Sequence, residues 1–335
     1  MMDWISQIFF AVCLCSIAGS CGLLEWRLLL PVLERRRPDW ILPMLKLTVL
    51  LYLCPIGYVL VYFGLMDSTR ERFFSALFLT TNIISVALKV FAVVWLVAIC
   101  VQLPQQMRLL RRDIRMRRGD VPLEQEGVEE LFREICGELG IRRPIDLVAN
   151  DLCFSPVRTG IVRPAILLPY GVQYSEKELR MIFLHELTHY LHCDLGTKIA
   201  CFLVQLIHWF NPAAGNLVEI YEDWSETACD LAVCRAGGEF FHPREYAETL
   251  LAHVEVEEEE EEGKKKPMTF FISLYGTEKV LERRVERMCN MKRTKKPLPK
   301  LLAILLAAVF VTVNNVPAYA ASHGMAGGYD WIYKS

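Results

Sequence analysis

Four long apolar runs constrain this chain more than any other feature of its sequence. Residues 4–24, 47–66 and 301–322 carry no charged side chain, and residues 73–103 carry only Lys89. A helix needs about 20 apolar residues to cross the hydrocarbon core of a bilayer, and each run reaches that length. The mean hydropathy of +0.27 fits the same class. The sequence therefore predicts a multi-pass α-helical membrane protein with four spans, rather than a soluble domain with buried core helices.

Basic residues beside these runs predict the orientation of the chain. Lys and Arg gather at 27–37, 108–118 and 292–300, whereas the loop 67–72 balances two Arg against two acidic residues. Because cytoplasmic loops carry the excess of basic residues, we expect the three clusters inside and the loop outside, with the N-terminus also outside. The expected domains are three transmembrane helices in 1–107, a cytoplasmic domain in 108–299, a fourth transmembrane helix in 300–322 and a short extracellular tail in 323–335.

Partners and redox state follow from the same layout. The basic cluster 108–118 directly follows a predicted span, where Lys and Arg usually contact anionic lipid. The lipid bilayer is therefore the expected partner, and no direct nucleic acid binding is expected. The twelve cysteines form no C-x-x-C pair, and none lies in the outer loop or the tail. We therefore expect reduced thiols.

A metal-binding motif lies in the expected cytoplasmic domain. Ser175 and Glu178 match a capping box, and apolar residues follow them at helical spacing. On that helix His185 and His189 are one turn apart and face the same way, so they can share one Zn²⁺. Glu186 lies beside them and can take a proton from the attacking water. The alternative is a helix whose histidines only pack or face water, but the apolar run favours burial, and buried histidines need partners.

A third metal ligand is expected on a later helix over about 214–235. Its acidic residues repeat, and Glu219-x-x-x-Asp223 and Glu226-x-x-x-Asp230 have the same form, so spacing alone does not choose between them. Either pair could instead belong to a solvated face. The more apolar surroundings of Glu226 favour burial near a metal, and there Asp230 could accept a hydrogen bond from a ligating imidazole.

The other predicted elements of this domain are short. We expect a helix over 120–143, strands over 145–149 and 165–169, a core helix over 199–210 that is too short to span, and a basic amphipathic helix over 278–290. The charged run 255–266 is expected to be a solvated loop.

Together these features resemble the BlaR/MecR-type antirepressor membrane zinc metallopeptidase family. The residues that carry the resemblance are Ser155-Pro156, Gly160, Pro164 to Pro169, His185 to His189 with Asp194, Asn211-Pro212, and Glu226 with Cys229 and Asp230. The resemblance implies a cytoplasmic α+β gluzincin-like zinc metallopeptidase domain.

The resemblance also implies roles for particular residues. The zinc ligands would be His185, His189 and Glu226, supported by Asp194 and Asp230. A strand near 163–168 would bind extended substrate by edge pairing. Self-cleavage would fall within 273–288, which contains Arg283 and Arg284.

Typical members of that family carry a penicillin-binding sensor domain after the fourth span, and from this sequence we expect no such domain. We therefore expect the signal to come from a separate sensor partner, the tail, the membrane or the loop 67–73. The expected function is a membrane-anchored zinc endopeptidase in signal transduction that cleaves a cytoplasmic winged-helix repressor, with self-cleavage as a further expected activity. The alternatives are a non-proteolytic transducer or scaffold, and a housekeeping membrane protease of the Ste24/HtpX type.

Overall fold

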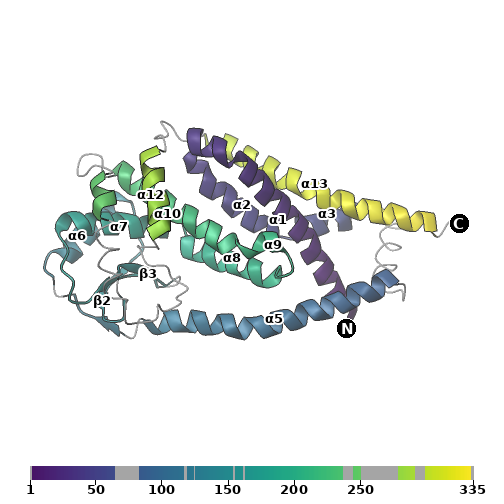
Figure 1. Cartoon of the computed structure of the whole chain (residues 1–335), viewed down its shortest axis with the longest axis horizontal. Coiled ribbons are helices and arrows are strands. Elements are labelled where there is room, and N and C mark those ends of the chain that lie inside the picture. The colour runs from purple at the N-terminus through teal and green to yellow at the C-terminus, as the bar shows by residue number, and fades with distance from the viewer. Residues whose placement is uncertain are drawn as a thin grey trace. The chain divides into compact units, whose positions relative to one another are not determined.

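The computed structural model describes residues 2–64, 83–116, 119–123, 125–153, 155–160, 163–236, 244–249, 278–290 and 299–332 (Figure 1). The chain divides into two compact units. The first, called the helical unit, comprises Met1–Pro104, Ile199–Tyr221 and Thr294–Ser335. The second, called the mixed unit, comprises Gln105–Lys198 and Glu222–Arg293.

Helices make up the described part of the helical unit. They are α1 (Met2–Arg36), the 3-10 helix η1 (Pro38–Trp40), α2 (Ile41–Leu53), α3 (Ile56–Gly64), the first part of α5 (Ile83–Met116), most of α8 (Asp194–Ile207), α9 (Pro212–Gly215), the start of α10 (Leu217–Ala236) and α13 (Lys300–Ile332).

Three stretches in the described residues are long and apolar enough to cross a membrane: Trp4–Arg36, Ser85–Pro104 and Lys300–Pro317. They correspond to the first, third and fourth apolar runs. Helix α13 continues as far as Ile332, past the expected end of the span at 322. The outer loop 67–73 and the charged run 255–266 lie outside the described residues.

The second apolar run, predicted as one span over 47–66, is not one continuous helix in the described residues. Helix α2 ends at Leu53, and α3 begins at Ile56. Cys54 between them has extended backbone, with φ −95° and ψ 119°. The next residue, Pro55, lacks an N–H group and its ring clashes with helical backbone before it. The described part of the run therefore holds two helices that are each shorter than a span.

Residues 199–221 were expected within the cytoplasmic domain, but they pack in the helical unit. Trp95 Nε1 donates to the backbone oxygen of Ile207 at 2.7 Å, and His208 Nε2 lies 3.0 Å from the backbone oxygen of Tyr52. Asn211, which caps α9, donates its Nδ2 to Ser16 Oγ at 2.7 Å. These bonds attach the run to α1, α2 and α5.

A four-stranded sheet forms the base of the mixed unit, with the strand order β1-β2-β4-β3. The strands are β1 (Asp120–Val121), β2 (Asp146–Asn150), β3 (Val157–Thr159) and β4 (Ala165–Pro169). Strands β2 and β4 run parallel, and the other pairs are antiparallel. The strands predicted over 145–149 and 165–169 are thus confirmed.

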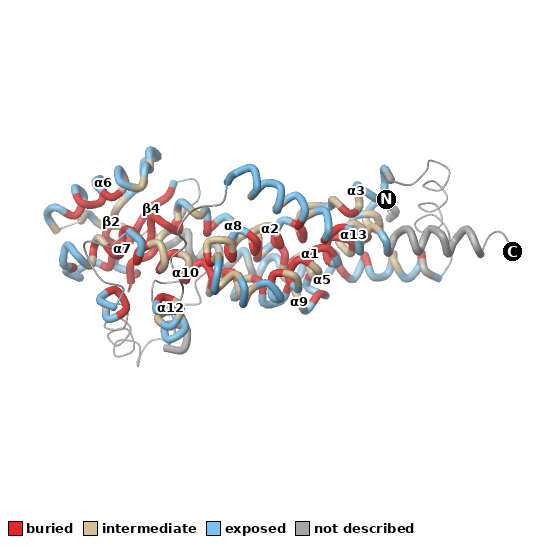
Figure 2. The backbone as a smooth tube through the Cα atoms, turned by 90° about the horizontal axis from the view of Figure 1, so that it is seen from above, coloured by how far each residue is buried: buried red, intermediate tan, exposed pale blue. Residues whose placement is uncertain are grey.

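Strand β4 does not have the edge position that was expected for a strand near 163–168. It pairs with β2 on one side and with β3 on the other, so its backbone is already hydrogen-bonded on both sides. All five of its residues are buried, as Figure 2 shows. Extended substrate therefore cannot pair with residues 165–167 of β4 while β3 stays paired.

The helix predicted over 120–143 is shorter than expected. Its described helical part is α6 (Val128–Glu138), and the preceding Gly127 has the left-handed φ of 79°. Asp120 and Val121 form β1 instead, because they pair with Asn150 and Ala149 of β2.

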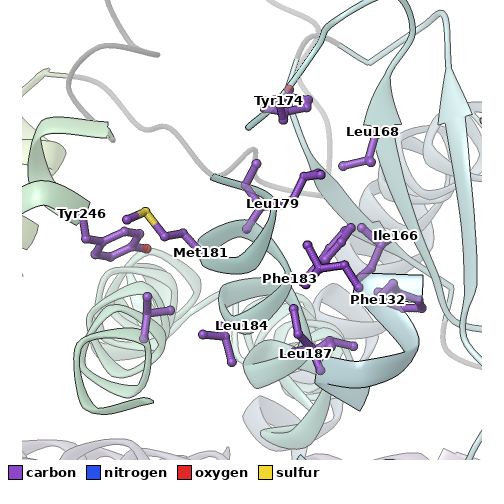
Figure 3. Close-up of a cluster of buried hydrophobic side chains, with 14 of the residues drawn as sticks. Phe132, Ile166, Leu168, Tyr174, Leu179, Met181, Phe183, Leu184, Leu187 and Tyr246 are labelled. Atoms are coloured by element: carbon purple, nitrogen blue, oxygen red, sulfur yellow. The ribbon is translucent and has the colours of Figure 1, made fainter. Parts of the chain in front are cut away.

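Helix α6 and helix α7 (Glu176–Leu191) build the core of the mixed unit against the sheet. Phe132 and Phe183 meet edge to face at 5.1 Å, with Ile166 of β4 beside them (Figure 3). Apolar side chains on α7 are therefore fixed on several sides, and the motif in the same helix is held in a packed core.

Candidate metal centre

Helix α7 begins with the predicted capping box, which is confirmed. The Ser175 side chain accepts from the backbone N–H of Glu178, and Glu178 Oε2 accepts from the Ser175 N–H at 2.7 Å. This end fixes where the helix starts. Two turns later the helix is surrounded by protein, and His185, Glu186 and His189 are all buried.

Three side chains from α7 and α10 converge on one point. His185 Nε2 and His189 Nε2 lie 3.0 Å apart. The two Glu226 oxygens lie 3.3 Å from these nitrogens, one from each. Two imidazole nitrogens and a carboxylate are the donor set of many catalytic zinc sites. Glu219, the alternative that spacing left open, is exposed on α10.

The carboxylate of Glu226 provides a further test of whether a cation fits. Its Oε2 atom is buried and makes no hydrogen bond to a described residue, and the guanidinium of Arg284 lies 3.5 Å away. A buried carboxylate oxygen normally has a partner. A metal ion shared with the two Nε2 atoms would satisfy this oxygen, so the residues present fit a divalent cation.

Asp194 holds the imidazole of His189 from behind. Its Oδ2 accepts from His189 Nδ1 at 2.7 Å and from Ser225 Oγ at 2.6 Å. The proton is thereby kept on Nδ1, and the Nε2 lone pair is left for a metal. Asp194 reaches this place because Cys193, just after α7, has a left-handed φ of 55°. That conformation costs about 1 kcal/mol for a residue other than glycine.

His185 is held by a different arrangement. Asp230 was expected to accept a hydrogen bond from the imidazole, but the hydroxyl of Tyr246 connects the two. Tyr246 Oη lies 3.0 Å from His185 Nδ1 and donates to Asp230 Oδ1 at 2.8 Å. The direct distance from His185 Nδ1 to Asp230 Oδ1 is 3.4 Å. Sequence reasoning missed Tyr246, because it lies 61 residues from His185 and belongs to no local motif.

Arg284 was expected in a segment that the protease cuts, but it is a buried residue of a helix beside the metal centre. It lies within α12 (Glu278–Asn290), and its side chain is only 1% exposed. Its Nε and Nη2 atoms donate to the two Asp230 oxygens at 2.7 Å each, and Nη1 lies 3.5 Å from Glu226 Oε2. Arg283 is half exposed. A cut between the two arginines would need α12 to unfold locally, and residues 273–277 lie outside the described part.

The charges around the site shift one another. Burial raises the pKa of Glu226, but His189, His185 and Arg284 outweigh burial and hold that pKa well below its usual value. Burial likewise opposes ionisation of Asp230, yet Arg284 lowers its pKa to about 2. Burial lowers the pKa of His185, whereas Asp230 and Glu226 raise it to about 9. The carboxylates that stabilise a proton on His185 would stabilise a metal cation in its place.

Cys229 lies near the same residues, but its chemistry does not suit a ligand. It is fully buried and forms a second close group with His189 and Asp194. Burial and the nearby carboxylates raise the pKa of its thiol well above the usual value. Because thiolates, not thiols, bind metals, the group of His185, His189 and Glu226 is the better metal centre.

The chain is similar to a family of known proteins. Residues 74–288 match the family model described as BlaR1 peptidase M56. The regulatory protein BlaR1 of Bacillus licheniformis is 24% identical over 236 residues, which cover 69% of this chain and 38% of BlaR1. The methicillin resistance mecR1 proteins of Staphylococcus aureus and Staphylococcus epidermidis are 30% identical over 104 residues, 31% of this chain and 17% of theirs. The chain thus matches less than half the length of these relatives.

Proposed function

Because the chain belongs to the BlaR1 peptidase M56 family, we propose that it is a membrane-anchored zinc endopeptidase that transmits a signal by cutting protein. The observation that carries this proposal is the convergence of His185 Nε2, His189 Nε2 and Glu226 in a buried site. These three residues would hold the zinc and would leave a position open for water or substrate, as catalytic zinc sites require.

Each residue of the site has a task in peptide hydrolysis. His185, His189 and Glu226 would hold the zinc, which when bound supplies a Lewis acid. Glu186, next to His185 on α7, would act as the general base that takes a proton from the attacking water and later returns it to the leaving amine. Asp194 keeps the His189 proton on Nδ1, so the imidazole stays correctly oriented throughout.

The names of the relatives favour a place in regulation. BlaR1 is described as a regulatory protein, and the mecR1 proteins are described by methicillin resistance. We propose that the substrate is a cytoplasmic winged-helix repressor, that the chain also cuts itself within 273–288, and that the inducing signal arrives through a separate sensor partner or the membrane.

The proposed orientation follows the basic clusters of the sequence. The N-terminus and the tail 323–335 would lie outside, and the zinc site would face the cytoplasm, where a repressor is found. Apolar helices such as Trp4–Arg36 support a membrane location.

A test separates metal binding from catalysis. Full-length protein in lipid nanodiscs is analysed for zinc by mass spectrometry and incubated with a proteome-derived peptide library, whose cut products are sequenced. The wild type should hold one zinc and cut peptides, whereas Glu186→Ala should keep the zinc and lose the cuts, because the base is not a ligand. Cuts of equal number in Glu186→Ala, or a wild type without zinc, would contradict the proposal.

A further inference from the structure

The helix α12 contributes to the metal centre from a distant part of the sequence. It follows the undescribed residues 250–277, yet it packs along α10, the helix that carries Glu226. Arg287 of α12 donates to Asp223 Oδ2 at 2.8 Å and lies 4.0 Å from the centre of the Trp224 ring. One turn earlier, Arg284 reaches the acidic residues beside the metal site. The two arginines therefore occupy the same helix but contact different groups.

A fully buried arginine needs compensation, because an unpaired charge in a protein interior is strongly unfavourable. Arg284 forms a two-point contact with Asp230, the geometry in which guanidinium and carboxylate bind best. It thereby neutralises Asp230 and leaves the charge of Glu226 to face the two imidazoles. Without Arg284, the buried carboxylates of Asp230 and Glu226 would both lose a cationic partner.

Arg284 is linked to His185 by a series of hydrogen bonds through Asp230 and Tyr246, and the donor of each bond is fixed. An ionised carboxylate only accepts, so Asp230 Oδ1 accepts from both Arg284 Nη2 and Tyr246 Oη. The Tyr246 proton is thus committed to Asp230, and Tyr246 Oη can only accept from His185 Nδ1, 3.0 Å away. His185 Nδ1 must then carry a proton, so Nε2, which lies 3.3 Å from Glu226 Oε2, is the nitrogen that can bind a metal.

We propose that Arg284 and Tyr246 are positioning residues of the metal centre, acting through Asp230 on His185 and, for Arg284, directly on Glu226. This inference rests on the proposed zinc site and adds that α12 is part of the peptidase rather than a connection to α13. Neither residue touches the metal point itself. Their effect is to hold one tautomer of His185 and one orientation of Glu226.

The test compares three variants of the full-length protein in nanodiscs. Tyr246→Phe removes one hydroxyl and keeps the ring, and Arg284→Lys keeps the charge but loses the two-point contact. Arg287→Lys is the matched control, because Arg287 fastens the same helix to α10 without touching Asp230 or Glu226. Zinc affinity is measured by competition with a chelator, and the visible spectrum of the cobalt-loaded protein reports the ligand geometry.

We expect Tyr246→Phe and Arg284→Lys each to weaken zinc binding by about 10- to 100-fold and to alter the cobalt spectrum, as loss of an outer hydrogen bond to a ligand does. Arg287→Lys should leave both readouts within about twofold of the wild type. Equal losses in all three variants would show that α12 acts only by packing. Wild-type affinity in Tyr246→Phe would overturn the inference while leaving the zinc site intact, whereas a wild type without zinc would overturn both.

Discussion

Arg284→Met removes the buried charge of α12 and keeps much of the apolar length of the side chain. The wild-type guanidinium makes two 2.7 Å hydrogen bonds to Asp230 and lies 3.5 Å from Glu226. Removing one partner of a buried ion pair costs about 3–5 kcal/mol, because the other charge is left buried and unpaired. For a unit of this size that corresponds to a fall in Tm of about 6–20 °C.

The measurement follows thermal unfolding of the full chain in nanodiscs with a chelator present, so that bound metal does not contribute. Hydrogen exchange of peptides from α10 and α12 separates the mixed unit from the helical unit. The adjacent Arg283→Met is the matched control. Arg283 is half exposed, and its contact with Asp223 is a long one of 4.0 Å. An exposed pair of this kind contributes at most about 1 kcal/mol.

A second change shows whether charge is the cause. In Arg284→Met combined with Asp230→Asn, both members of the pair become neutral, so the double variant should be more stable than Arg284→Met alone. A loss below about 1 kcal/mol in Arg284→Met would refute the reasoning, because it would mean that water reaches Asp230 and Glu226. A double variant less stable than the single one would show that shape, not charge, holds α12 in place.

Two further predictions concern the metal directly. Glu226→Gln should weaken zinc binding at least about tenfold, because a charged ligand is lost. Glu219→Gln, on the exposed part of α10, should not change zinc binding. Equilibrium dialysis with zinc measures the affinity of both variants. Zinc affinity should also fall by about tenfold for each pH unit below about 9, because the pKa of His185 is raised to about 9 and a proton then competes with the metal. An affinity that is flat between pH 6 and 8 would contradict this competition.

The local parts of the structure could be read from the sequence. The capping box at Ser175, the helix through His185 and His189, and the strands β2 and β4 each depend on neighbouring residues, and each was predicted. The apolar surroundings of its helix and the family resemblance also favoured Glu226 over Glu219, and Glu226 lies beside the two histidines.

The missed parts depend on contacts between distant residues. Nothing near Tyr246 or Arg284 in the sequence indicates that both meet Asp230, because the pairing comes from the packing of α12 on α10. The inner position of β4 depends on β3, which is too short to be read from periodicity. The broken second run was readable in principle, since Pro55 lies in its middle, but apolar content alone did not reveal the break.

The position of Asp194 couples metal binding to the stability of the first turn of α8. It is the first residue of α8, where a negative charge is favoured by the helix dipole, and it also accepts the His189 proton. A cation at Nε2 makes that proton more acidic, so the hydrogen bond to Asp194 should become stronger when metal binds. Metal occupancy should therefore slow the fraying of residues 194–198, and the first turn of α8 would report the loaded state of the site.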